Sequence, residues 1–171
     1  YGARASNGVI MITTKRGSRG EAIVTYDCYT GWQEMPSQLD MLNLREYATH
    51  HNERAALGLV DRSSAFVRPD LLGEGTNWQD ELFRKAIMTS HNLSASGGNE
   101  MTTYAISGGY LNQEGIALGS GFRRLSLRAN VDTNIKSWLR GGVNFSFGES
   151  KQDVGTDNNT IMSALLQQPT V

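Results

Sequence analysis

Apolar and polar residues alternate along much of this chain, and the alternation is sharpest between positions 122 and 133. The apolar positions of that stretch are Leu125, Leu127, Ala129 and Val131. The same period of two runs through 21–33, 90–98, 103–113 and 138–150. Because neighbouring side chains of a β-strand point to opposite faces, the pattern predicts five strands, each with one apolar and one polar face.

Residues 34–89 interrupt this alternation with helical spacing. Asn43 followed by Glu46 is a capping-box pattern at the start of a helix that Gly58 would end. We expect a second, shorter helix at 77–86, with Asn77 as its cap and with Leu82 and Phe83 facing inward. The region therefore predicts a long helical insertion between strands.

The two ends of the chain carry other patterns. Residues 8–15 (GVIMITTK) form a continuous apolar run, which is typical of a strand buried on both faces. The tail at 158–169 has the spacing of one or two helical turns, which Pro169 would stop.

A strand with one apolar and one polar face has two ordinary environments. In a soluble β-sandwich the apolar face is the core and the polar face meets water. In an outer-membrane β-barrel the apolar face meets lipid and the polar face lines the lumen. Soluble β-proteins are the commoner class, so a secreted β-sandwich that binds glycans stays open as an alternative.

Three features favour the barrel. The longest alternating stretches match the roughly 9–11 residues of a membrane-crossing strand. Their connections alternate between tight turns and longer links, as in barrels. Aromatic side chains lie near strand ends on the apolar face, where a membrane interface favours them. These are Trp32, Tyr104, Tyr110 and Phe147.

Composition narrows the class of protein further. The chain has 16 Lys and Arg against 17 Asp and Glu, a net charge of -1, which removes the general electrostatic case for binding nucleic acid. No apolar run approaches the roughly 20 residues of a membrane helix, so the helical membrane class is excluded. The 19 Gly against 3 Pro suit β-structure with tight turns. Cys28 is the single cysteine and cannot form an internal disulfide.

Several motifs resemble those of one family. The opening YGARASNGVIMITTKRG is similar to the end of the plug domain in SusC/RagA-type TonB-dependent outer-membrane transporters, with Ala5-Ser6 where that family often has Gly-Ala. Later segments follow in the family's order: LNLREYA, NWQDELFR, NLSASGGNEMTTYAISGGYLNQEG and FRRLSLRANVD. The resemblance covers essentially the whole chain, and the ordered set is more specific than any single motif.

The resemblance implies a fragment of a larger receptor, with an all-β fold that carries helical loop insertions. Residues 1–18 would be the C-terminal end of the plug. Residues 19–171 would be the first strands, about five antiparallel ones, of a transmembrane β-barrel of about 22 strands. The helical insertion at 34–89 would be a long extracellular loop.

The resemblance also implies a function. It is TonB-dependent import of a large nutrient, an oligosaccharide or a peptide, across the outer membrane of a Bacteroidota-type bacterium, as part of a SusCD-type complex. The implied partners are a SusD-like surface lipoprotein, outer-membrane lipid, and TonB, which would bind through a segment absent here. Such import needs no cofactor and no covalent chemistry.

Candidate functional residues lie on the polar side of two predicted strands. Arg124, Arg128, Arg140 and Asn144 would face the lumen, where the arginines could contact the plug or a passing substrate. The alternative is that these arginines pair with Asp132 and neighbouring acids or simply face water. The candidate residues of the plug signature are Tyr1, Gly2, Arg4, Asn7 and Gly8, of which Asn7-Gly8 favours a turn.

Other residues invite a chemical interpretation that their spacing disfavours. His50 and His51 stand near Glu46 and Glu53, but adjacent histidines on a helix point in different directions, which favours a solvated face over a metal site. Trp32 and Trp78 could stack on sugars, but we expect interfacial anchoring or packing instead. We expect no enzyme, because neither a G-x-S-x-G elbow nor a phosphate loop is present. A β-rich hydrolase would need a cleft with paired carboxylates.

Overall fold

The computed structural model describes residues 17–155 and 158–170. The apolar run at 8–15 lies outside the described residues, and so does the candidate signature formed by Tyr1, Gly2, Arg4, Asn7 and Gly8. Their predicted roles therefore stay predictions.

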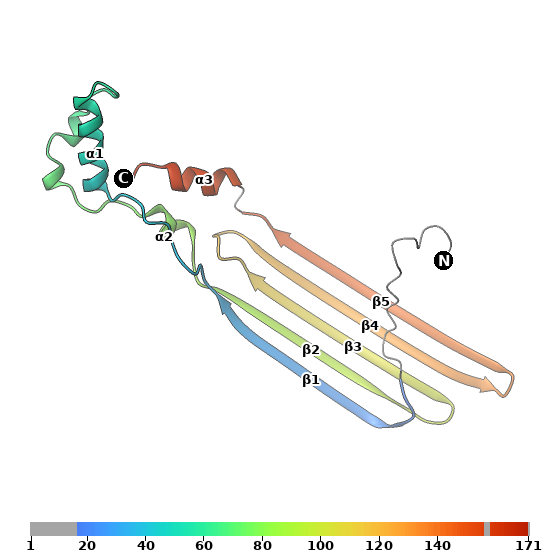
Figure 1. Ribbon diagram of the computed structural model, residues 1–171. Helices are drawn as coiled ribbons and strands as arrows, with labels where there is room; N and C mark the ends of the chain where they lie inside the picture. Colours follow the sequence, from blue (N-terminus) through green and yellow to red (C-terminus); the bar gives the residue numbers. More distant parts are fainter. Residues whose placement is uncertain (1–16, 156–157, 171) are drawn as a thin grey trace, which may run out of the picture. The chain divides into compact units, whose positions relative to one another are not determined.

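A five-stranded antiparallel sheet is the main element of the structure (Figure 1). The strands neighbour one another in chain order: β1 (Gly20–Gln33), β2 (Ala86–Gly98), β3 (Thr102–Glu114), β4 (Gly121–Lys136) and β5 (Leu139–Asp153). With 13 to 16 residues each, they are much longer than the usual five or six. The five strands predicted from the alternation are confirmed.

Strand β2 begins four residues earlier than the alternation predicts. The sequence before residue 90 lacks a period of two, yet its backbone is already paired. Phe83 forms an isolated antiparallel bridge with Ala117, and the Arg84 N–H donates to the carbonyl of Ile116 over 2.8 Å. This long-range pairing holds the chain extended before the alternating pattern starts.

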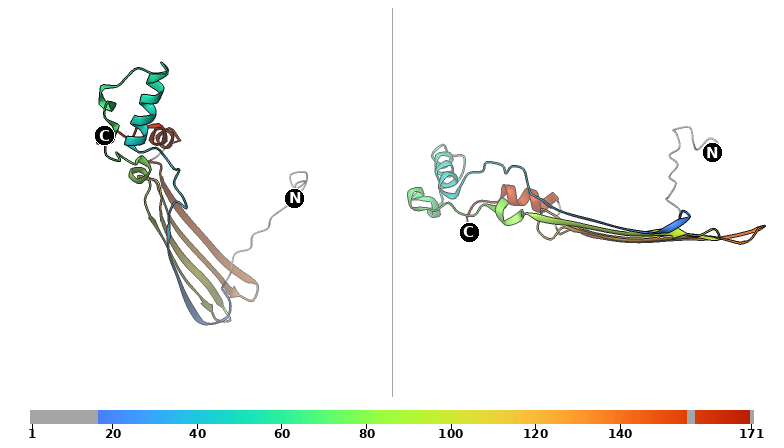
Figure 2. Two further views of the ribbon diagram at one scale, coloured as in Figure 1. Left: turned by 60° about the vertical axis from the view of Figure 1, so that its left-hand side comes forward. Right: turned by 90° about the horizontal axis from the view of Figure 1, so that it is seen from below.

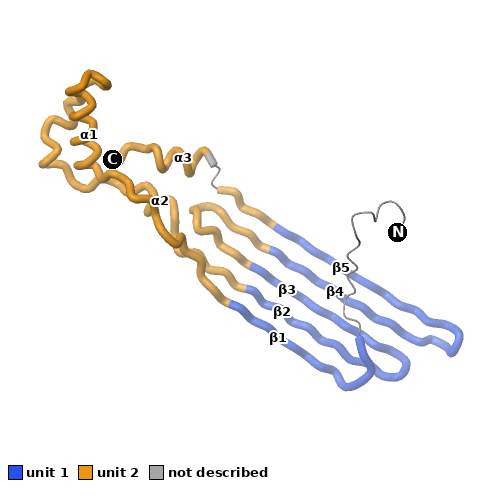
Figure 3. Tube along the Cα trace, viewed as in Figure 1, with its two compact units in different colours: residues 1–29, 90–111, 124–150 blue, residues 30–89, 112–123, 151–171 orange. Residues whose placement is uncertain are grey.

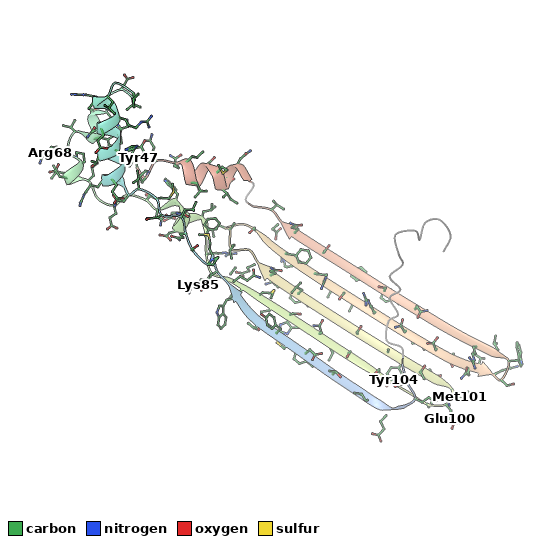
Figure 4. The ribbon with its side chains drawn as sticks, in the orientation of Figure 1. Tyr47, Arg68, Lys85, Glu100, Met101 and Tyr104 are labelled. Atoms are coloured by element: carbon green, nitrogen blue, oxygen red, sulfur yellow. The ribbon has the colours of Figure 1, made fainter. Side chains whose placement is uncertain are left out.

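The connections between strands alternate in length, as predicted. The turn between β2 and β3 is short, and Glu100 and Met101 stand at its tip (Figure 4). The Asn99 side chain shapes it, because its Oδ1 accepts from the backbone N–H groups of Met101 and Thr102 over 2.9 and 2.8 Å. Strands β4 and β5 are joined by two residues, whereas β1 and β2 are separated by residues 34–85.

The sheet is a single layer, which is seen edge-on in the right-hand view of Figure 2. Contacts between strands fix which side chains share a face. On the apolar face, a Cβ built on Gly108 of β3 would lie 3.3 Å from Leu127 Cδ2 of β4, and the hydroxyls of Thr102 and Thr133 are hydrogen-bonded at 2.8 Å between the same two strands. On the opposite face, a Cβ built on Gly109 of β3 would lie 2.8 Å from Asn92 Oδ1. The predicted division into an apolar and a polar face is therefore observed.

The helices follow their predicted start signals. The first helix, α1 (Leu44–Ala56), has the expected capping box: the Glu46 N–H donates to Asn43 Oδ1 over 2.9 Å, and the Asn43 N–H donates to Glu46 Oε2 over 3.0 Å. Gly58 follows its end with a φ of 71°, a backbone conformation that favours glycine. The last helix is α3 (Asn158–Leu166), and Pro169 follows it.

The second helix is shorter than predicted. It covers only α2 (Trp78–Leu82), because Phe83 returns to an extended backbone with φ -107° and ψ 144° and enters the bridge to Ala117. Two short 3-10 turns, η2 (Ser64–Phe66) and η3 (Pro69–Leu71), lie between α1 and α2. Among the described helices, none is long and apolar enough to cross a membrane.

The chain divides into two compact units (Figure 3). Unit 1 comprises residues 1–29, 90–111 and 124–150, and unit 2 comprises 30–89, 112–123 and 151–171. The buried hydrophobic residues of the described chain are Ala48, Phe66 and Ala86, and all three belong to unit 2. In the described part of unit 1 the sheet therefore has no hydrophobic core of its own.

Candidate functional site

Large apolar side chains on one face of the sheet are exposed in the part of the chain that the structure describes. Leu125, Leu127 and Val131 on β4 are 38%, 42% and 36% exposed. Other large side chains exposed on this face are Val24, Tyr26, Leu93, Ile106, Tyr110, Val143, Phe145 and Phe147. A soluble sandwich would need a second sheet over these residues, and the described part of the chain contains one sheet. Within the described residues, the sheet that a soluble sandwich would pack over this face is not found.

Two polar side chains on this face satisfy each other. Tyr26 of β1 and His91 of β2 have nearly parallel rings, and Tyr26 Oη lies 2.7 Å from His91 Nδ1. Burying an unpaired hydroxyl or imidazole in an apolar environment costs free energy. Their mutual hydrogen bond makes the pair compatible with an apolar environment.

The opposite face carries the predicted polar residues. Arg124, Arg128, Arg140 and Asn144 are all exposed and all belong to unit 1. None of the three arginines forms an ion pair with another described residue, Asp132 included. The pairing with Asp132 that we considered from the sequence is not observed.

Two of these arginines border a shallow hollow of about 610 Å³ on the polar face. Arg124 and Arg128 line it together with small polar residues of β2, β3, β4 and β5, whereas Arg140 and Asn144 do not. The small polar residues are Asn92, Ser94, Ser107, Ser126, Ser146 and Ser150. The structure thus brings together two of the four predicted residues.

Glycines keep this hollow open. A Cβ on Gly109 would come within 2.8 Å of Asn92 Oδ1 and 2.9 Å of Ser126 Oγ, so a larger residue would push these groups aside. A Cβ on Gly148 would meet nothing within 4 Å. The polar face is therefore lined by hydroxyl, amide and guanidinium groups around an open space.

A second feature, in unit 2, was missed by sequence reasoning. Gln79 of α2 is 3% exposed, although we expected Leu82 and Phe83 to face inward and they are half-buried. The Gln79 Nε2 donates to the carbonyl of Leu39 over 2.8 Å, and the Leu39 N–H donates back to Gln79 Oε1 over 2.9 Å. This amide therefore holds the segment that precedes α1.

The neighbours of Gln79 in the NWQDELFR motif have related roles. Asn77 caps α2 by accepting from the Gln79 N–H over 3.1 Å, and Asp80 accepts from Gln38 over 2.6 Å. The Trp78 indole N–H donates to the carbonyl of Gln168 over 2.9 Å, which favours packing over sugar stacking. Asn77, Trp78 and Gln79 border a cavity of about 840 Å³. The motif ties three segments of unit 2 together.

The histidines of α1 have separate environments. His50 Nδ1 lies 3.8 Å from Glu53 Oε2 at the surface. The His51 ring packs against Tyr47 and Phe66, with centroids 6.3 and 5.1 Å away. Within residues 17–155 and 158–170, no three His, Cys, Asp or Glu side chains are grouped as metal ligands.

One ion pair in this region lowers the pKa of a carboxyl group. Arg68 donates from its Nε and Nη2 to the two carboxylate oxygens of Asp70 over 3.1 and 2.8 Å. These hydrogen bonds hold the pKa of Asp70 below its usual value. Arg68 and Asp70 are both well exposed, so the pair contributes little to stability.

Comparison with known proteins identifies relatives of nearly the whole chain, although no protein-family model matches it. TonB-dependent receptor SusC of Bacteroides thetaiotaomicron is 34% identical over 172 residues, which cover 99% of this chain and 16% of SusC. TonB-dependent receptors P3 and P26 of Formosa agariphila are 31% and 32% identical, over 90% and 99% of this chain. The chain spans only 14% to 17% of the length of these relatives.

Solved structures of related receptors have the same fold as this chain. The RagAB peptide importer in its closed-closed state matches with a TM-score of 0.69 and 26% identity, covering 89% of this chain and 20% of the RagAB chain. A second RagAB peptide transporter structure matches with a TM-score of 0.70. The uncovered apolar face and the long antiparallel strands agree with a barrel wall. The chain belongs with the SusC/RagA-like TonB-dependent receptors of the outer membrane, as one stretch of their transmembrane β-barrel.

Proposed function

We propose that this chain is part of a longer receptor that imports a large nutrient across the outer membrane with energy delivered by TonB. The observation that carries the proposal is the two-faced sheet. Its apolar face is exposed at Leu125, Leu127 and Val131, which suits contact with lipid. Its polar face carries Arg124 and Arg128 without acidic partners among the described residues, which suits a water-filled lumen.

The proposal assigns residues 1–18 to the end of a plug and residues 19–171 to the first barrel strands. A Cβ on Gly17 would overlap the backbone N, C and O atoms of Tyr104 on β3. The segment entering β1 therefore runs directly against the sheet, which supports a passage from plug to barrel at this point. The alternation of short turns with long connections supports assigning the 34–89 region to the extracellular side.

The imported nutrient is an oligosaccharide or a peptide, and a SusD-like surface lipoprotein is the partner that would cap the barrel. The similarity to the RagAB peptide importer supports a peptide, and the similarity to SusC supports a shared transport mechanism. In this mechanism TonB pulls on the plug and opens a polar path for a solute too large to diffuse. Neither step requires a catalytic residue.

The test is uptake by the bacterium that encodes the receptor. Deletion of the receptor gene should abolish growth on one class of polymer, peptide or oligosaccharide, while growth on the matching monomers stays normal. Deletion of tonB should have the same effect, and deletion of the gene for the SusD-like lipoprotein should reduce uptake. Unchanged growth and uptake of every polymer tested in the receptor mutant would contradict the proposal.

A further inference from the structure

The apolar face of the sheet ends in ion pairs on the side that leads into the helices. Lys85, which Figure 4 labels at this end of the sheet, directly precedes β2. Every residue of these pairs belongs to unit 2. The pairs are Glu34–Lys85, Arg84–Glu114 and Arg123–Asp153, with nitrogen–oxygen distances of 2.9, 3.5 and 3.4 Å. Charged groups therefore follow the apolar band at one end of all five strands.

The charged residues of β4 and β5 stand on the same face as the apolar side chains. Arg123 lies two positions before Leu125 on β4. Lys151 and Asp153 lie four and six positions after Phe147 on β5. Because side chains alternate between the two faces of a strand, even spacing places each charged residue on the face of its apolar neighbour. At about 3.3 Å per residue, Arg123 stands about 7 Å beyond Leu125 along β4.

Two cations share one acid in this cluster. Asp153 lies 3.4 Å from Arg123 Nη2 through its Oδ2 and 3.6 Å from Lys151 Nζ through its Oδ1. Glu149 on β5 forms no ion pair with either cation, and neither does any other described acid. The three side chains are 42% to 65% exposed, and exposed ion pairs are weak. Arg123 and Lys151 can therefore bind a second anion.

The surroundings identify the source of that anion. Beyond the apolar band of a membrane-facing surface lie lipid headgroups, which add about 5–8 Å on each side of the hydrocarbon core. The position of Arg123 about 7 Å beyond Leu125 matches this layer. Trp32 lies two positions before Glu34 and is 75% exposed, as is typical of an aromatic side chain at a membrane interface. The cluster is thus continuous with the lipid-facing surface.

We propose that Arg123 and Lys151 bind the phosphate group of one phosphorylated lipid of the outer leaflet, whose acyl chains lie along Leu125 and Phe147. A guanidinium offers paired N–H donors that match phosphate oxygens, and the Lys151 ammonium adds a point charge. The long stems of both side chains can lie along the apolar surface while their charged ends reach the headgroup. The choice of leaflet rests on the proposed function, which places residues 34–89 on the extracellular side.

The test uses the full-length receptor in detergent, with lipid binding measured by native mass spectrometry. The two probes are monophosphorylated lipid A and the same glycolipid without its phosphate. Arg123→Gln and Lys151→Gln each remove one cation, and Asp153→Asn removes the shared negative charge. Arg124→Gln is the matched control, because it removes an exposed arginine from the adjacent position on the polar face of β4.

The wild-type receptor should bind the phosphorylated lipid at least about tenfold more tightly than the dephosphorylated one. Arg123→Gln and Lys151→Gln should each weaken this binding about tenfold, since a hydrogen bond to a charged group contributes enough for that factor. Arg124→Gln should change it less than about twofold. Asp153→Asn should tighten it about threefold, because the competing carboxylate is gone.

Three results would overturn the proposal. These are equal binding of the two lipids by the wild type, equal binding by Arg123→Gln and Arg124→Gln, and weaker binding by Asp153→Asn. The last would show that the cluster only joins β4 to β5. Uptake by the receptor tests the transport function separately. Equal binding of both lipids with normal uptake would remove the lipid site alone, whereas phosphate-dependent binding without any uptake would remove the transport function alone.

Discussion

Replacing Gln79 by leucine tests how the segment before α1 is held in unit 2. The Gln79 side chain forms the two backbone hydrogen bonds with Leu39 that a neighbouring β-strand would otherwise form. It accepts from the Leu39 N–H over 2.9 Å and donates to the Leu39 carbonyl over 2.8 Å. Leucine has a similar volume and can form neither hydrogen bond. The substitution therefore leaves two backbone groups without their partner and creates no large cavity.

The size of the effect follows from burial. An unpaired buried backbone group costs about 1–3 kcal/mol. Gln79 is 3% exposed, but Leu39 is 61% exposed, so water replaces part of the lost bonding. We expect a loss of about 2 kcal/mol in the free energy of opening this segment, or about a 30-fold rise in its open population.

Hydrogen exchange on the full-length receptor, read by mass spectrometry, measures this directly. Exchange of residues 34–43 should accelerate about 30-fold in Gln79→Leu, while the strands of unit 1 keep their rates. Gln38→Ala is the control, because it removes two exposed side-chain hydrogen bonds, one to Asp80 and one from Asn77, and should accelerate exchange less than about fivefold. Unchanged exchange of 34–43 in Gln79→Leu would refute the assigned role of the Gln79 amide.

Three further predictions concern the sheet. Gly17→Ala should destabilise the receptor by about 1–3 kcal/mol, because the added methyl group overlaps the Tyr104 backbone. The control is Gly73→Ala, whose Cβ position meets no atom within 4 Å. The unfolding temperature of Gly17→Ala should be lower than that of the control, and equal temperatures would contradict the prediction. Val143→Arg on the apolar face should lower the free energy of unfolding in lipid vesicles by about 2–4 kcal/mol, as measured by reversible urea unfolding. Asn144→Arg on the polar face should lower it far less. Equal losses of stability in the two variants would contradict the assignment of the faces. The 171 residues expressed alone should be insoluble in plain buffer, because β1 and β5 are the edge strands of the described sheet and its apolar face is exposed. A cooperative thermal transition of a soluble monomer would overturn this.

The strands and their faces were predictable because alternation is a local property. Each of the five stretches carries its own period of two, so no knowledge of the partner strand was needed. The capping box of Asn43 and Glu46 was predictable for the same reason, since its two partners are three residues apart. The early start of β2 was not predictable, because pairing of Phe83 with Ala117 is set by a segment more than thirty residues away.

The candidate site was predictable only in part. Alternation placed Arg124, Arg128 and Arg140 on one face, but it carries no information on register between strands. Register decides that the first two border the hollow and that Arg140 does not. The role of Gln79 was hidden for a similar reason: a glutamine in a short polar helix suggests solvent, and its partner Leu39 lies forty residues earlier.

The central claim is that one face of the sheet meets lipid and the other meets water in the receptor. Single cysteines at successive positions 124–131 of β4, in a Cys28→Ser background, would be spin-labelled in the full-length receptor in lipid vesicles. Collision rates with oxygen and with a water-soluble nickel chelate measure the two environments. We predict strict alternation, with oxygen favoured at Leu125, Leu127 and Val131 and nickel favoured at Arg124 and Arg128. High nickel accessibility at every position would contradict the account.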